Sequence, residues 1–152
     1  MLARVLIFLV LNFAALGIGG FFTGPGTSSE WYTNMNQAPW TPPGWVFGAA
    51  WTTIMICFAF FMAYAWDKTK NKKTLIILFG VQWVLNVLWN PVFFYFKEVA
   101  LALVVISSLT ILVGYFLFTY WSIIKAKALL VAPYFIWLLI ATSLNAYILF
   151  QN

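Results

Sequence analysis

Three side-chain amides follow one another at four-residue intervals in the stretch QWVLNVLWNPVFF, at Gln82, Asn86 and Asn90. In a helix this spacing places all three along one face. Such amides either hydrogen-bond neighbouring helices or present polar atoms to a ligand. We favour helix packing for Gln82 and Asn90, and a ligand-lining position for Asn86 at the centre of the stripe. Pro91 follows directly and predicts a kink in this helix.

Aromatic side chains supply a second kind of chemistry, stacking against a flat ring. The sequence contains nine tryptophans, and 21% of its residues are aromatic. Phe47 and Trp51 lie four residues apart, and Trp51 lies deeper in its apolar run than an interfacial tryptophan is expected to reach. Trp137, Ala141 and Asn145 share another helical face. The small Ala141 leaves a notch that admits either a neighbouring helix or the edge of a ligand, and the spacing does not decide between them.

Other catalytic chemistry has little support in the sequence. There is no histidine, which removes the commonest metal ligand and general base. The three carboxylates, Glu30, Asp67 and Glu98, all lie at the ends of apolar runs or between them, and no known catalytic motif is present. The single cysteine, Cys57, is interpreted as a small core residue rather than a redox or ligand group. These features argue against an acid–base enzyme, a proton-driven pump and a metal site.

The elements that carry these residues are apolar runs long enough to span a bilayer. Hydrophobic residues make up 64% of the 152-residue chain and charged residues 7%, whereas a soluble domain is about 25% charged. We therefore predict a single all-α integral membrane domain over residues 1–152, a bundle of five transmembrane helices. The predicted helices cover about residues 5–22, 43–66, 75–96, 99–121 and 129–150. The later connections are short, whereas the first, Thr23 to Thr41, is predicted to be a long ordered loop packed on the bundle.

The segment WTPPGW introduces the second predicted helix. Thr41 is a good N-cap residue, and Pro42 suits the first helical position because its missing N–H would have no partner there. We therefore predict that this helix begins at the double proline. Trp40 and Trp45 are interpreted as interfacial anchors.

The distribution of basic residues predicts the orientation in the membrane. With five helices, the N-terminus and the second and fourth connections share one side. The basic residues on that side are Arg4, Lys68, Lys70, Lys72, Lys73, Lys125 and Lys127, whereas Lys97 lies on the other. We predict a cytoplasmic N-terminus, with the first loop and the C-terminus outside. The net charge of +5 is then a topology signal and a contact with anionic lipid, not a nucleic-acid-binding surface.

One alternative concerns the first apolar run, which ends in the small residues ALGIGG. Small residues after an apolar run are also typical of a cleaved signal peptide, and cleavage would leave four helices. We favour a retained helix, because the run is long for a signal peptide and its loss would remove one wall of the bundle.

Three segments together resemble the tryptophan-rich sensory protein / translocator protein (TspO/MBR) family. They are WYTNMNQAPWTPPGWVFGAAW, QWVLNVLWNPVFF and PYFIWLLIATSLNAYILFQN, and the resemblance extends over nearly the whole chain. It implies five transmembrane helices with a pocket that opens toward the first loop, a homodimer, and a place in the bacterial inner membrane. It also implies binding of porphyrins, notably protoporphyrin, and of drug-like aromatic ligands of isoquinoline and benzodiazepine type, with no required cofactor.

By matching motif, the resemblance implies a ligand site at Tyr32, Pro42, Phe47, Trp51, Asn86, Trp89, Ser107, Trp137 and Ala141. Bacterial relatives have been linked to light-dependent porphyrin breakdown, a role that would involve Trp51 and Trp137. Some relatives also carry a cholesterol-recognition pattern in which a tyrosine precedes a basic residue. Here Tyr147 is followed by ILFQN, so sterol binding is not supported.

We therefore expect a membrane receptor or sensor for tetrapyrroles, with the ring stacked on Trp51 and Trp137 in a mostly apolar pocket. Asn86 and Tyr32 would orient the polar edges of the ligand, and the first loop would act as a lid. Two alternatives stay open. One is light-dependent degradation of the bound porphyrin, which needs no acid–base group. The other is facilitated transport of porphyrin or another lipophile.

Overall fold

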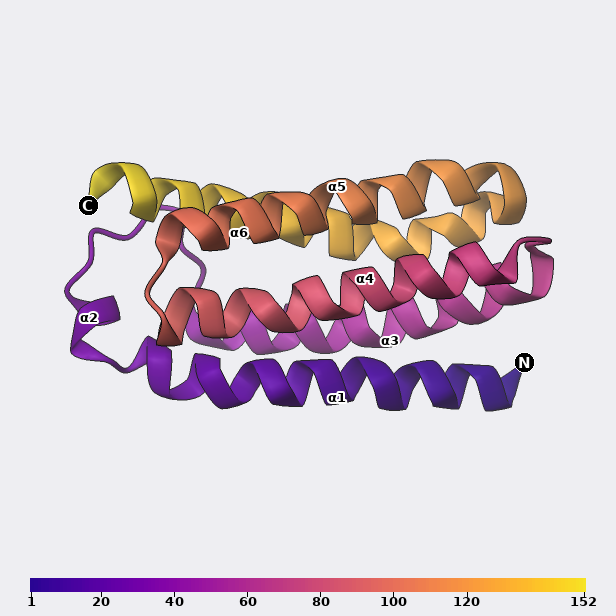
Figure 1. Ribbon diagram of the computed structural model, residues 1–152, viewed down its shortest axis with the longest axis horizontal. Helices are drawn as coiled ribbons and strands as arrows, with labels where there is room; N and C mark the ends of the chain where they lie inside the picture. The colour runs from indigo at the N-terminus through magenta and orange to yellow at the C-terminus, as the bar shows by residue number, and fades with distance from the viewer.

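The computed structural model describes residues 1–152, and nearly all of them are helical (Figure 1). Five long helices run side by side and alternate in direction along the chain (Figure 1). The elements are α1 (Leu2–Thr27), α2 (Glu30–Thr33), α3 (Gly44–Lys68), α4 (Lys72–Asn90), the π-helical turn η1 (Pro91–Tyr95), α5 (Val99–Ile124), the 3-10 segment η2 (Lys125–Val131) and α6 (Ala132–Gln151). The predicted all-helical fold is confirmed.

Four continuous helical stretches are long enough and apolar enough to cross a membrane: Leu2–Thr27, Gly44–Lys68, Lys72–Tyr95 and Val99–Gln151. The last stretch has 53 residues, because η2 joins α5 to α6 without a break in helical structure. The α5 and α6 arms of this stretch pack against each other (Figure 1). The chain begins to turn back at Lys125, which has a positive φ of 56°.

The bundle divides along its length into two halves that differ in packing. The half that contains the N-terminus is filled by aromatic side chains. Phe58 stacks on Phe61 with ring centroids 5.7 Å apart, and Tyr134 meets Phe58 edge-on at 5.4 Å. All three are fully buried, and truncation of such a side chain to alanine costs about 3–5 kcal/mol. This half therefore holds the helices in register, and the other half, beside α2, contains the cavity described below.

Helix α1 extends further than predicted. It continues through Pro25 to Thr27, so the prediction that the loop begins at Thr23 was wrong. Proline removes one backbone hydrogen bond and ordinarily ends a helix. Here the extra turn is held by a tertiary contact, because the buried Gly26 packs directly on the ring of Phe94 in η1. The connection to α3 is correspondingly shorter, and it includes the one-turn helix α2.

Helix α3 begins at Gly44 rather than at the double proline. The prediction that Thr41 caps this helix and that Pro42 is its first residue was wrong. A residue that precedes a proline is driven from the helical to the extended conformation, and both Thr41 and Pro42 precede a proline. Thr41 instead closes a turn, because its hydroxyl donates to the Ala38 carbonyl at 2.7 Å. Pro43 is extended, at φ −57° and ψ 150°, and is the last residue before the helix.

At Pro91, where we predicted a kink, the α-helical hydrogen bonding of α4 ends and the π-helical turn η1 begins. Pro91 has no N–H, so the carbonyl of Val87 one turn earlier loses its backbone partner. The side chain of Asn90 compensates, because its Nδ2 lies 3.5 Å from the Val87 carbonyl oxygen and 3.0 Å from that of Asn86. The chain then widens into η1, a π-helical form that is frequent at functional sites.

Candidate ligand-binding site

A cavity of about 580 Å³ lies in the half of the bundle beside α2. All five long helices and the loop before α3 contribute to its walls. The walls contain 28 residues, of which 15 are hydrophobic and none carries a formal charge. Small-molecule sites have volumes of about 300–1,000 Å³ and mostly apolar walls with a few polar groups. The cavity therefore has the size and chemistry that suit a flat aromatic molecule.

Most of the residues implied by the family resemblance meet at this cavity. Those that line it are Tyr32, Pro42, Phe47, Trp51, Asn86, Trp89, Trp137 and Ala141. Ser107 is not among them. Helix α5 presents Ile106 and Leu109 to the cavity instead, and Ser107 lies about 100° around the helix from Ile106. The structure therefore does not bring Ser107 to the site.

Two aromatic pairs link α3 to α6 at the cavity wall. The ring of Phe47 meets Trp137 edge-on with centroids 5.2 Å apart, and Trp51 meets Tyr134 edge-on at 5.9 Å. Trp137 is 6% exposed, and its Nε1 is buried without a hydrogen-bond partner in the protein. Buried N–H groups are rarely left unpaired. The Nε1 atom is buried within the wall, so Trp137 offers the cavity its ring surface rather than a hydrogen bond.

The amide stripe of α4 divides between structural and lining roles. Gln82 is buried away from the cavity, and its Oε1 accepts a hydrogen bond from the Tyr134 hydroxyl at 3.0 Å. Asn86 lines the cavity, and its side-chain amide forms no hydrogen bond with the protein. Asn90 does both, because it lines the cavity while its Oδ1 accepts from the Thr23 hydroxyl at 2.6 Å. Asn86 is thus the member of the stripe that is free to orient a ligand.

Sequence reasoning missed some polar residues that shape the wall. Trp89 donates from Nε1 to Oδ1 of Asn145 at 2.9 Å, and Asn145 donates from Nδ2 to the Val99 carbonyl at 3.0 Å. This link joins α4, α5 and α6 and fixes the plane of the Trp89 ring. The four-residue spacing from Ala141 to Asn145 indicated the correct face, but the partners come from other helices. Thr23 was missed because it was assigned to the first loop.

The loop between α2 and α3 is fastened to the end of α6. The backbone N–H of Asn36 donates to Oδ1 of Asn152 at 2.9 Å, and Nδ2 of Asn152 donates to the Asn36 carbonyl at 3.1 Å. Nε1 of Trp40 donates to the Ser143 hydroxyl oxygen at 3.1 Å, and its ring meets Tyr147 edge-on. Trp40 therefore ties the loop to α6, a role that its prediction as an interfacial anchor did not include.

Tyr32 closes the cavity on the α2 side. Its ring packs against Phe93 and Phe94, with centroids 6.3 Å and 5.6 Å away. Burial raises the pKa of the Tyr32 phenol above its ordinary value. The hydroxyl is therefore neutral at physiological pH and suited to orient a polar edge of a ligand.

The site contains no group suited to acid–base or metal chemistry. No charged residue lines the cavity, and the ion pair between Arg4 and Asp67 lies at the opposite end of the bundle. No group of His, Cys, Asp and Glu side chains is placed to hold a metal ion. The arrangement can stack a flat ring between aromatic walls and orient its edges through a few neutral polar groups.

The sequence of this chain is similar to those of several known proteins. The profile of the TspO/MBR family matches residues 6–151. The tryptophan-rich sensory protein of Cereibacter sphaeroides is 33% identical over 116 residues, which are 76% of this chain and 73% of that protein. The tryptophan-rich protein TspO of Archaeoglobus fulgidus is 33% identical over 153 residues, covering 100% of this chain and 96% of the relative. The human translocator protein is 27% identical over 124 residues, 79% of this chain and 73% of that protein.

The match to the family profile and the alignment with the Archaeoglobus fulgidus protein both extend over nearly the whole chain. The long apolar helices are those of an integral membrane protein, and the chain belongs to the TspO/MBR family.

Proposed function

We propose that this protein is a membrane receptor or sensor that binds porphyrins of the protoporphyrin type, and drug-like aromatic ligands, in the cavity inside the bundle. One observation carries the proposal: Trp51 of α3, Trp137 of α6 and the free amide of Asn86 on α4 all face one uncharged cavity. Each aromatic contact contributes about 0.5–1.5 kcal/mol beyond the burial of its area. The family resemblance found in the sequence points to the same class of ligand.

The polar groups of the wall suit the edges of such a ligand. The amide of Asn86 offers hydrogen bonds deep in the cavity, whereas Thr27, Gln37 and Thr41 line it beside the loop. Burial of an unpaired carboxylate is costly. We therefore assign the ring of protoporphyrin to the space between the tryptophans, and its carboxylates to the loop side of the cavity.

We further propose that each of the five long helices crosses the bilayer once, with α5 and α6 as the two arms of the last apolar stretch. The basic residues other than Lys97 belong to one end of the bundle, which supports a cytoplasmic N-terminus in a bacterial inner membrane, with the loop and the C-terminus outside. The family resemblance supports a homodimer. Labelling of single cysteines placed at Lys127 or Asn36, in a Cys57→Ser background and in sealed cells, tests the orientation, because only the Asn36→Cys protein should react with an impermeant reagent.

A protoporphyrin titration, followed by quenching of tryptophan fluorescence, tests ligand binding. We expect saturable quenching in the wild-type protein and at least about tenfold weaker binding by the Trp51→Ala/Trp137→Ala double variant, because two stacking contacts are lost. Trp121→Ala is the matched control, since Trp121 is 47% exposed and does not line the cavity. Unchanged affinity in the double variant would show that the ligand binds elsewhere.

Light-dependent degradation of the bound porphyrin is the second candidate function. The observation that favours it is the place of Trp51 and Trp137 on the same cavity, where an indole could donate an electron to the excited ring. Such chemistry, driven by light and oxygen, needs no acid–base residue. The test is an absorbance time course under illumination. Equal rates of porphyrin loss with wild-type and Trp51→Phe protein would rule out a specific role for that indole.

A further inference from the structure

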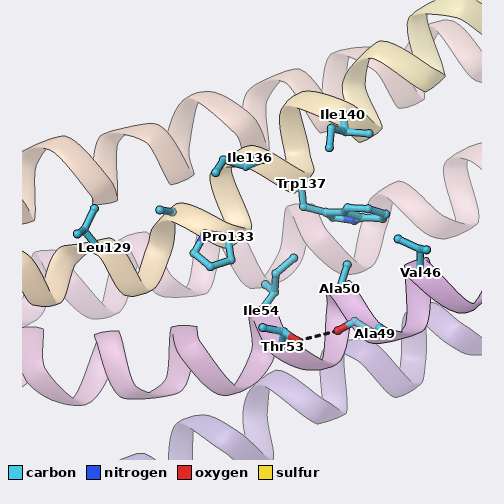
Figure 2. A pocket seen from close by; sticks show the side chains of 11 residues that line it. Val46, Ala49, Ala50, Thr53, Ile54, Leu129, Pro133, Ile136, Trp137 and Ile140 are labelled. Carbon is cyan, nitrogen blue, oxygen red and sulfur yellow. Dashed lines mark hydrogen bonds between the residues drawn. The ribbon is translucent and has the colours of Figure 1, made fainter. Parts of the chain in front are cut away.

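An open apolar groove of about 640 Å³ lies on the outside of the bundle between α3 and α6 (Figure 2). Of its 11 lining residues, nine are hydrophobic. Its α3 side consists of the small residues Ala49, Ala50 and Thr53 flanked by Val46 and Ile54, and its α6 side includes Ile136 and Ile140. Ala49, Thr53 and Ile136 are exposed, so the groove opens toward the surroundings of the bundle. We call it the α3–α6 groove.

Trp137 is the one residue that lines both the α3–α6 groove and the inner cavity. Figure 2 shows its ring extending from α6 toward α3, between Ile140 on one side and Ala50 on the other. One indole, backed by its edge-on contact with Phe47, therefore forms the partition between the groove and the cavity.

The indoles of Trp83 and Trp89, on α4, are tied to the protein by hydrogen bonds, whereas that of Trp137 is not. The indole N–H of Trp83 donates to the Leu11 carbonyl at 2.8 Å, and that of Trp89 donates to Asn145. The N–H of Trp137 has no partner in the protein. A change in the side-chain torsions of Trp137 therefore breaks no hydrogen bond, whereas the same change at Trp83 or Trp89 breaks one.

A ligand could also reach the inner cavity through the loop between α2 and α3, but that route requires more contacts to break. The two hydrogen bonds between Asn36 and Asn152 and the bond from Trp40 to Ser143 all hold that loop on α6. The loop route also begins in water, in which a porphyrin ring is poorly solvated, whereas an apolar groove on a membrane-embedded bundle is open to ligand dissolved in the bilayer.

We propose that the porphyrin passes between the bilayer and the inner cavity through the α3–α6 groove, with the side chain of Trp137 as the gate. This inference rests on the proposed function of the inner cavity. The groove supplies an apolar path, and rotation of one indole that has no hydrogen bond to break opens it. That rotation would bring the buried N–H of Trp137 to a ligand acceptor during passage.

The test measures porphyrin kinetics in phosphatidylcholine nanodiscs by stopped-flow tryptophan quenching with protoporphyrin IX. Ala49→Leu narrows the groove, and we expect association and dissociation to slow together by about tenfold, which corresponds to roughly 1.4 kcal/mol of added barrier, with the Kd unchanged. Ile140→Ala widens the groove and should accelerate both rates. Ala14→Leu is the matched control, because Ala14 is exposed on α1 and lines neither the groove nor the cavity.

Several outcomes would overturn the proposed route. Saturable binding with unchanged rates in both groove variants would exclude it. Faster exchange in Asn152→Ala, again with unchanged rates in the groove variants, would identify the loop as the route. An effect of Ala49→Leu on thermal stability in the bilayer, with no effect on porphyrin kinetics, would identify a lipid acyl chain as the occupant of the groove. The absence of saturable quenching in the wild-type protein would instead contradict the proposed function itself.

Discussion

The indole N–H of Trp89 donates to the side-chain oxygen of Asn145 at 2.9 Å, and the amide of Asn145 donates in turn to the Val99 carbonyl. One asparagine thereby connects three helices at the wall of the cavity. Asn145 is 2% exposed, and its removal would leave the part-buried N–H of Trp89 without a partner. The loss of a partner from such a group costs about 1–3 kcal/mol.

We expect Asn145→Leu to lower the free energy of unfolding by about 1–3 kcal/mol and to weaken porphyrin binding, because the Trp89 ring is no longer fixed. Thermal denaturation and the quenching titration measure the two effects. Ser108→Ala is the control, since the exposed Ser108 hydroxyl donates only to a carbonyl of its own helix. Equal melting temperatures for wild type and Asn145→Leu would show that the three-helix link contributes no stability.

The approach of α1 to η1 predicts opposite effects at two glycines of α1. A Cβ at Gly26 would lie 2.3 Å from Cδ1 of Phe94, whereas a Cβ at Gly17 would have no atom within 4 Å. Gly26→Ala should destabilise the protein by about 1–3 kcal/mol through overpacking. Gly17→Ala should stabilise it by up to about 1 kcal/mol through higher helix propensity. Melting temperatures that shift in the same direction for both variants would contradict the contact with Phe94.

The attachment of the loop to α6 predicts a local change in backbone protection. In Asn152→Ala the two side-chain bonds to Asn36 are lost, and we expect amide hydrogen exchange in residues 34–41 to accelerate roughly tenfold. Gln151→Ala is the control, because Gln151 contacts Asn36 only through its backbone carbonyl. If both variants exchange as the wild type does, the side chain of Asn152 does not hold the loop.

The raised pKa of Tyr32 predicts that the packing of α2 on the bundle contributes less stability at alkaline pH. Burial raises this pKa above the ordinary value of 10.0, so ionisation favours the state in which the phenol is exposed to water. The contribution of docked Tyr32 to stability is therefore complete below pH ~10 and declines as the pH rises from there through the raised pKa. Thermal denaturation measured between about pH 9 and pH 11 should show this decline in wild type and in Tyr95→Phe. The Tyr32→Phe variant should lack this component of the decline.

The all-helical membrane bundle followed from composition and from the length of the apolar runs, because a continuous apolar run of about 20 residues spans the bilayer as a helix, which satisfies its own backbone hydrogen bonds. The α4 spacing likewise indicated a lining position for Asn86, and Asn86 lies on the cavity wall. Both inferences depend on residues close together in the sequence. Trp45 is 75% exposed, and its role as an interfacial anchor stays a prediction.

The predictions that failed depend on competition between local preference and distant contacts. Thr41 has the chemistry of an N-cap, but the two following prolines impose an extended backbone. Pro25 has the chemistry of a helix end, but the contact between Gly26 and Phe94 carries α1 past it. The partner of Asn145 lies 56 residues away, and no periodicity within one helix identifies it.

The uncharged lining of the cavity has an electrical consequence. A formal charge that moves through the whole membrane potential exchanges about 2.3 kcal/mol with the field for every 100 mV. The gate proposed for Trp137 and the walls around Asn86 contain no such charge. Rotation of that indole therefore moves no charge of the protein, and in the empty protein the equilibrium between closed and open gates is set by packing rather than by the energised state of the membrane.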